Sequence, residues 1–125
     1  MKIKHCIQNK EFLEKITNFG REKIICSIGL GSLVLAEAGL LKGKKATTHH
    51  KHFLRLRRYC QIENKRVVIA GNVITSGGML CAVDLASSIL ELCYSKSIAD
   101  IILEYIKQES RPKGVRLDLG EIDEE

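Results

Sequence analysis

The chain has 125 residues, of which 45% are hydrophobic and 28% are charged, and its formal net charge is +5. This length is typical of a single domain with its own core, and the composition excludes a disordered chain and a fibrous protein. The long stretches without a charged side chain, 24–36 and 67–83, are both shorter than the roughly 20 residues that a membrane-spanning helix needs.

The first half of the chain predicts a helix, a strand, a tight turn and a second helix. Residues 9–19 place apolar side chains at helical spacing, with Asn9 as the N-cap and Gly20 as the end. The run 23–28 is rich in β-branched residues and has no polar alternation, which is typical of a strand buried on both faces of a parallel sheet. A turn of small residues, 29–32, leads into a helix at 33–38.

The second half predicts short strands followed by longer helices. Strands are expected at 46–49 and 73–76, with a hairpin of 59–63 and 66–70 across Asn64 and Lys65. A basic helical or irregular connection is expected at 50–58, and helices at 79–94 and 98–107. We therefore predict one α/β domain over 1–110, followed by an acidic, flexible tail at 111–125.

The cysteines give no sign of a metal site or a disulfide framework. Their number is five, and no two have the spacing Cys-x-x-Cys. The first residues are not followed by the apolar core of a signal peptide. We expect a soluble, cytoplasmic protein with reduced thiols, and no metal or cofactor.

The turn at 29–32 has the form of a nucleophile elbow. A strand that passes through small residues directly into a helix holds one residue beside the free amides of the helix. Such amides stabilise an oxyanion, and the helix dipole lowers the pKa of a thiol. Glycine also permits the same bend without any chemistry, so the turn alone does not establish catalysis.

Two blocks of sequence resemble a known family. They read Leu-Ala-Glu-Ala-Gly-Leu-Leu-Lys-Gly-Lys-Lys-Ala-Thr-Thr-His at 35–49 and Asn-Val-Ile-Thr-Ser-Gly-Gly-Met-Leu-Cys-Ala-Val-Asp-Leu-Ala at 72–86. They are similar to the ThiJ/PfpI family of the class I glutamine amidotransferase-like superfamily, in particular to the branch of isonitrile hydratases and AraC-type regulator ligand domains. The resemblance covers 23–106 and implies a flavodoxin-like three-layer sandwich. It does not fix an activity, because the family includes proteases, deglycases, hydratases, chaperones and regulators.

The resemblance also implies where the site lies. Family members place a cysteine at the elbow and a histidine after the next strand. Counted back from the first block without gaps, the cysteine position falls on Gly29, and the histidine position falls on His49. Cys26 is three residues too early and lies within the strand, so it is the alternative nucleophile only in a rearranged turn. The pocket is expected to be lined by Leu30, Thr48, His50, Ser76 and Gly77.

The beginning of the chain departs from the family pattern. Family domains start with further strand and helix units that supply an acidic residue, whereas only one short helix is predicted before Lys23. The chain thus resembles a domain truncated at its N-terminus, and part of its sheet is expected to be exposed. A homo-oligomer or a partner chain that covers the sheet is the expected consequence.

The basic residues of 49–58 allow a phosphate-binding role. A solvated basic connection is the favoured interpretation, because the aromatic side chains expected of a nucleic-acid surface are scarce. Nucleic acid is therefore not expected as a partner.

Two functional hypotheses remain. The first is a degenerate, non-catalytic module with a binding, regulatory or assembly role, in which a small molecule is a further expected ligand. The second is a cysteine-dependent hydrolase, hydratase or deglycase that uses Cys26 or a site completed by another chain.

Overall fold

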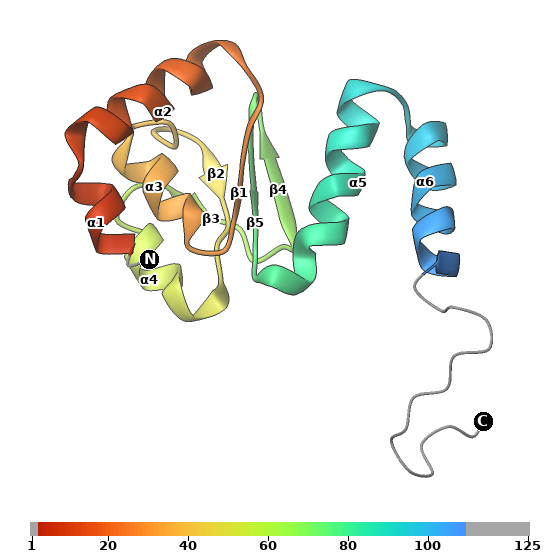
Figure 1. The fold of residues 1–125 in the computed structure, drawn as a ribbon. Coiled ribbons are helices and arrows are strands. Elements are labelled where there is room, and N and C mark those ends of the chain that lie inside the picture. Colours follow the sequence, from red (N-terminus) through yellow and green to blue (C-terminus); the bar gives the residue numbers. More distant parts are fainter. Residues whose placement is uncertain (1–2, 110–125) are drawn as a thin grey trace. The chain divides into compact units, whose positions relative to one another are not determined.

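The computed structural model describes residues 3–109 and shows a mixed α/β fold, as predicted (Figure 1). Its helices are α1 (Ile3–Gln8), α2 (Lys10–Glu22), α3 (Gly31–Glu37), α4 (Phe53–Leu56), α5 (Ala82–Cys93) and α6 (Lys96–Glu109). Its strands are β1 (Ile25–Ile28), β2 (Lys45–Ala46), β3 (Gln61–Ile62), β4 (Val67–Ala70) and β5 (Val73–Ser76). Short 3₁₀ turns lie at His50–His52 and Met79–Cys81. The tail predicted for 111–125 lies outside the described residues.

The strands form two sheets. The larger has the order β1-β5-β4, and β1 runs parallel to β5 with Ile25 opposite Val73. The smaller sheet is the parallel pair of β2 and β3, with Lys45 opposite Gln61. The parallel pairing of β1 brings the carboxyl ends of β1 and β5 to the same edge, where the predicted elbow lies.

Strand β1 is buried on one face only, so the prediction of two buried faces is wrong. Ile25 and Ser27 are each 7% exposed, whereas Cys26 is half-buried and Ile28 is 44% exposed. The buried face packs into the core, where Ile25 joins residues of α3 and β5; the core cluster also contains Leu33, Leu35, Ala36, Leu41, Ala46, Leu56 and Val73. The continuous apolar run arises because isoleucine occupies both faces of the strand, not because both faces are covered.

Helix α2 begins where predicted and ends later. The side chain of Asn9 accepts a hydrogen bond of 3.1 Å from the amide of Phe12, which confirms the N-cap. Gly20 does not end the helix, which continues to Glu22. A Cβ at Gly20 would lie 2.6 Å from Leu40 Cδ1, so this glycine permits close packing instead. A further helix, α1, precedes α2, and β1 is the first strand in the described part of the chain.

The predicted hairpin across Asn64 and Lys65 is wrong. Strand β3 pairs in parallel with β2, and β4 pairs antiparallel with β5 across Gly71 and Asn72. Gly71 has φ of +64°, the left-handed conformation that two-residue hairpin turns require and that glycine adopts without strain. Neither Asn64 nor Lys65 is a glycine, and the chain forms its hairpin turn at Gly71, the next glycine in the sequence.

The described residues belong to two compact units, Met1–Ser88 and Ile89–Glu125. The first unit holds both sheets and the candidate site, and the second holds the end of α5 and all of α6. The predicted helix at 79–94 is shorter than expected, because its first turn is a 3₁₀ turn and α5 begins at Ala82. The predicted domain boundary at 110 stays a prediction. None of the helices in 3–109 is long and apolar enough to cross a membrane.

Candidate functional site at the turn after strand β1

The turn between β1 and α3 places its glycine in a left-handed backbone conformation. Gly29 has φ of +56°, the left-handed region that strains residues with a side chain. Its amide donates to the carbonyl oxygens of Ser76 at 3.1 Å and Gly77 at 2.6 Å. Its own carbonyl oxygen accepts from the hydroxyl of Thr48 at 2.7 Å. Groups at the end of β5 and after β2 therefore hold Gly29 in this conformation.

The space above Gly29 is open. A Cβ built on this residue would meet only the carbonyl oxygen of Gly77 within 4 Å, at an ordinary contact distance of 3.7 Å. The predicted elbow thus has room for a side chain, but its residue, Gly29, carries none. The amide of Gly29 itself donates to two carbonyls.

A layer of buried, hydrogen-bonded hydroxyl groups lies next to the predicted elbow. The hydroxyls of Ser27 and Ser32 lie 2.8 Å apart, and Ser32 Oγ donates to the carbonyl oxygen of Thr47 at 2.7 Å. The amide of Thr47 donates to Thr75 Oγ1 at 2.9 Å, and Ser76 Oγ donates to the carbonyl oxygen of Ser27 at 2.9 Å. These bonds join β1, α3 and β5 to the segment after β2. Strand β2 ends at Ala46, so the predicted strand at 46–49 is too long.

His49 lies beside the elbow. Its Nδ1 accepts a hydrogen bond of 3.2 Å from the amide of Lys51, so the neutral ring carries its hydrogen on Nε2. Partial burial lowers the pKa of His49, and the nearby His50, His52 and Lys51 lower it further. The ring stacks on His50 with centroids 4.4 Å apart, and the centroid of His52 is 6.0 Å away. Within 3–109, no three His, Cys, Asp or Glu side chains are grouped so that they could hold a metal ion.

The structure brings Gly29 and His49 to one pocket. A Cβ on Gly78 would lie 3.1 Å from His49 Cδ2, which shows how close the histidine ring is to the loop after β5. The pocket, here called the elbow pocket, has a volume of about 430 Å³ and is lined by Ile28, Gly29, Leu30, His49, Lys51, His52, Gly78 and Met79. These lining residues include no thiol, hydroxyl or carboxylate.

The other predicted site residues lie in different parts of the structure. Leu30 lines the elbow pocket, whereas Thr48, His50 and Gly77 line an adjacent pocket of about 210 Å³ together with Cys81. Ser76 is fully buried and is engaged in the hydroxyl layer. Cys26 lies in the middle of β1, half-buried, and lines neither pocket.

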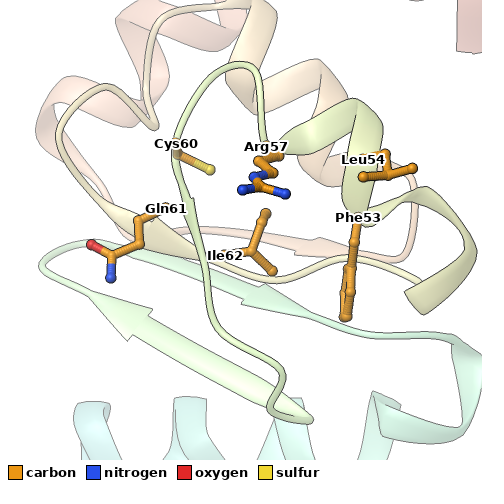
Figure 2. Close-up of a pocket in the computed structure, with 6 residues that line it drawn as sticks. All are labelled: Phe53, Leu54, Arg57, Cys60, Gln61 and Ile62. Carbon is orange, nitrogen blue, oxygen red and sulfur yellow. The ribbon is translucent and has the colours of Figure 1, made fainter.

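The basic residues of 49–58 do not share one pocket. Arg57 lines a cavity of about 550 Å³ between α4 and β3, and Figure 2 shows it beside Phe53 and Leu54 of the helix, with Cys60, Gln61 and Ile62 from the segment that follows. Arg55 and Arg58 line a third pocket with Glu37 and Tyr59. Only His49, Lys51 and His52 face the elbow pocket.

Several residues of the site were not predicted from the sequence. Lys51, His52, Gly78 and Met79 line the elbow pocket, and Ser27, Ser32 and Thr47 belong to the hydroxyl layer. A signal for the layer is present in the sequence, because a serine or threonine stands at or near the end of each apolar segment around the turn. Their mutual pairing is visible only in three dimensions.

Comparison with known proteins identifies the same region. A model of the DJ-1/PfpI family matches residues 2–92. The chain is 38% identical over 87 residues to isonitrile hydratase of Pseudomonas putida, covering 66% of this chain and 38% of the relative. It is 37% identical over 92 residues to protein DJ-1 homolog A of Arabidopsis thaliana, covering 69% of this chain and 23% of the relative.

Solved structures show the same fold. A ThiJ/PfpI family protein from Pseudomonas syringae superimposes with a TM-score of 0.76 at 28% identity, covering 90% of this chain and 47% of that one. Schizosaccharomyces pombe DJ-1 gives a TM-score of 0.70 at 24% identity over 87% of this chain and 57% of that one, a likeness of fold. The predicted flavodoxin-like fold is thereby confirmed, although the chain spans less than two thirds of the length of these relatives. From the family match over residues 2–92, the chain belongs to the DJ-1/PfpI family.

Proposed function

We propose that this chain is a non-catalytic member of its family that binds a small molecule in the elbow pocket. The observation that carries the proposal is the composition of the pocket wall. The residue at the elbow is Gly29, and none of the lining side chains is a thiol, a hydroxyl or a carboxylate. Covalent catalysis of the family type requires a nucleophile beside a base, and here only the base position is occupied, by His49.

Cys26 is poorly placed to replace the missing nucleophile. It lies within β1, where it stands opposite Ile74 in the parallel ladder, three residues before Gly29. Moving it to the turn would shift the pairing of β1 with β5. A shift by an odd number of residues would also move Ile25 and Ser27 out of the buried face. A thiol enzyme that uses Cys26 is therefore the alternative that the experiment must exclude.

The test compares turnover by the purified chain and by two cysteine variants. We expect no hydration of an isonitrile, hydrolysis of an amide or removal of a glycation adduct above the buffer rate, and no change in Cys26→Ser. Cys93→Ser, which removes an exposed thiol in α5, serves as the matched control. Turnover that is abolished in Cys26→Ser and retained in Cys93→Ser would overturn the proposal.

A thiol introduced at the turn tests the position of the elbow itself. Gly29→Cys places a side chain in open space at a backbone conformation that costs about 1–2 kcal/mol for a non-glycine residue. We expect iodoacetamide, followed by peptide mass mapping, to alkylate this thiol faster than Cys26. Slower alkylation at the introduced thiol would show that the turn does not present its residue to solvent.

We further propose that a second copy or another polypeptide covers the exposed side of β1. This strand ends the larger sheet in the described part of the chain, and Ile24 and Ile28 at its two ends are 40% and 44% exposed. Light scattering of the purified chain should give a mass above that of the monomer if copies associate. If the mass is monomeric, a partner polypeptide should be recovered by pull-down with the wild type and lost with Ile28→Lys. A monomeric mass together with no recovered partner would contradict the proposal.

A further inference from the structure

We infer that the ligand of the elbow pocket is a small organic anion, a carboxylate or a phosphate monoester that carries a short apolar tail. The inference rests on the proposed function and names the class of molecule that the pocket fits. It depends on the charge of the pocket wall, on the free donors that face the pocket and on the apolar side chains beside them.

All ionisable side chains that line the pocket are basic. His49, Lys51 and His52 come from one short segment, and no Asp or Glu lines the pocket with them. The ammonium group of Lys51 makes no ion pair or side-chain hydrogen bond in the described part of the chain. An unpaired cation in a pocket without carboxylates favours a negatively charged ligand.

The histidine ring adds a directed donor. Because Nδ1 of His49 accepts from the amide of Lys51, the neutral ring has its N–H at Nε2. This nitrogen would lie 3.8 Å from a Cβ on Gly78, at the side of the loop that forms the pocket wall. A carboxylate or phosphate oxygen accepts from such an N–H, whereas an alkylammonium ligand has no acceptor to offer.

The rest of the wall is apolar. Ile28, Leu30 and Met79 line the pocket, and Ile28 and Met79 are 44% and 86% exposed. Exposed aliphatic side chains beside a charged group favour a ligand with an apolar part next to its anionic head. The pocket volume of about 430 Å³ lies within the range of small-molecule sites.

The cavity between α4 and β3 provides a built-in control. Its Arg57 also stands beside apolar side chains, Phe53 and Ile62, but it is a different site (Figure 2). An anion that binds there would depend on Arg57 and not on Lys51. Comparison of Lys51→Gln with Arg57→Gln therefore assigns the anion to one pocket or the other.

The experiment titrates the whole chain with butanoate, butyl phosphate, neutral butanamide and cationic butylammonium, followed by amide chemical shifts in NMR spectra. We expect one or both anions to shift the amides of Gly29, Lys51 and Gly78, with weaker binding as salt is raised. Butanamide and butylammonium should bind more weakly. Which of the two anions binds more tightly distinguishes a carboxylate ligand from a phosphate monoester.

The variants make the assignment exact. Lys51→Gln should weaken anion binding about two- to five-fold, the range expected for one exposed charge contact, and Arg57→Gln should leave it unchanged. Lys51 and Arg57 are both exposed. Amide shifts that are unchanged away from the substituted residue would show that each variant is folded. Butanamide that binds at the elbow as tightly as butanoate, a loss of binding confined to Arg57→Gln, or no shift with either anion would overturn the inference. None of these outcomes concerns turnover, so the absence of catalysis in the proposed function is tested separately by the turnover assay.

Discussion

The hydroxyl of Thr48 donates a hydrogen bond of 2.7 Å to the carbonyl oxygen of Gly29, which lies 19 positions earlier in the chain. Thr48 is 1% exposed, so its hydroxyl is shielded from water. The contact connects the end of one parallel strand with the segment that follows another. Thr48 is therefore a positioning residue for the elbow.

Thr48→Val should destabilise the fold and loosen the elbow. The substitution keeps the shape of the side chain but removes the shorter of the two hydrogen bonds to the Gly29 carbonyl, whose other donor is the amide of Ser32 at 3.2 Å, and the loss of one hydrogen bond costs about 0.5–1.5 kcal/mol. Urea denaturation followed by circular dichroism measures the loss. Hydrogen exchange at the amide of Gly29 should also become faster than in the wild type, which a purely global destabilisation would not single out.

Thr47→Val is the matched control. Thr47 is also 1% exposed, but its hydroxyl makes only a long contact of 3.5 Å to the carbonyl oxygen of Thr48. Its bond to Thr75 uses the backbone amide, which the substitution retains. A stability change within about 0.5 kcal/mol is expected, as for a substitution that breaks no strong interaction. Equal losses in the two variants would show that the hydrogen bond to Gly29 has no special role.

The stability of the protein should depend on the protonation of His49. Partial burial and the neighbouring His50, His52 and Lys51 lower its pKa in the folded state below the ordinary value of 6.5. Below that value the unfolded chain takes up the proton more readily than the folded chain, so His49 reduces the free energy of unfolding as the pH falls. Above about pH 7.5 the ring is neutral in both states and makes no such contribution.

Urea denaturation at several values between about pH 7.5 and 5.5 measures this effect. As the pH is lowered, the free energy of unfolding should fall less steeply in His49→Gln than in the wild type. Gln8→Ala, which removes no titratable group from its exposed position on α1, should keep the wild-type slope. Identical slopes for all three proteins would contradict the shift assigned to His49.

The parts of the fold that follow from local signals could be predicted from the sequence. Asn9 marks the start of α2 because its side chain caps the next turn, and β5 was predicted with its observed bounds. The placement of Gly29 and His49 at one site came from the spacing of two family blocks, and the structure brings both residues to the elbow pocket. Their chemical roles stay predictions.

The partners of the short strands could not be predicted in the same way. Strand β3 has two residues, and its alternation fits a hairpin with β4 as well as a parallel pair with β2. The choice depends on long-range packing that no local pattern records. The hydroxyl layer was missed for a related reason, because a serine or threonine at a strand end is equally suited to a cap, a pocket or a buried bond.

The side chain of Asn72 joins the β4–β5 hairpin to the residues before β1. Its Nδ2 donates to the carbonyl oxygens of Gly20 and of Lys23, the latter at 2.7 Å, and the backbone carbonyl of Asn72 accepts from the amide of Ile25 at 2.9 Å. Asn72→Ala leaves two carbonyls without a donor, one of them on the buried Gly20, and should lower the free energy of unfolding by about 1–3 kcal/mol. Asn72→Asp should cost at least as much, because a carboxylate offers those carbonyls no donor. Asn64→Ala, at an exposed position with no side-chain hydrogen bond among the described residues, is the control and should change stability by less than about 0.5 kcal/mol in the same urea titration. If Asn72→Ala is as stable as this control, the hairpin turn does not depend on the asparagine to hold the end of α2 against the start of β1.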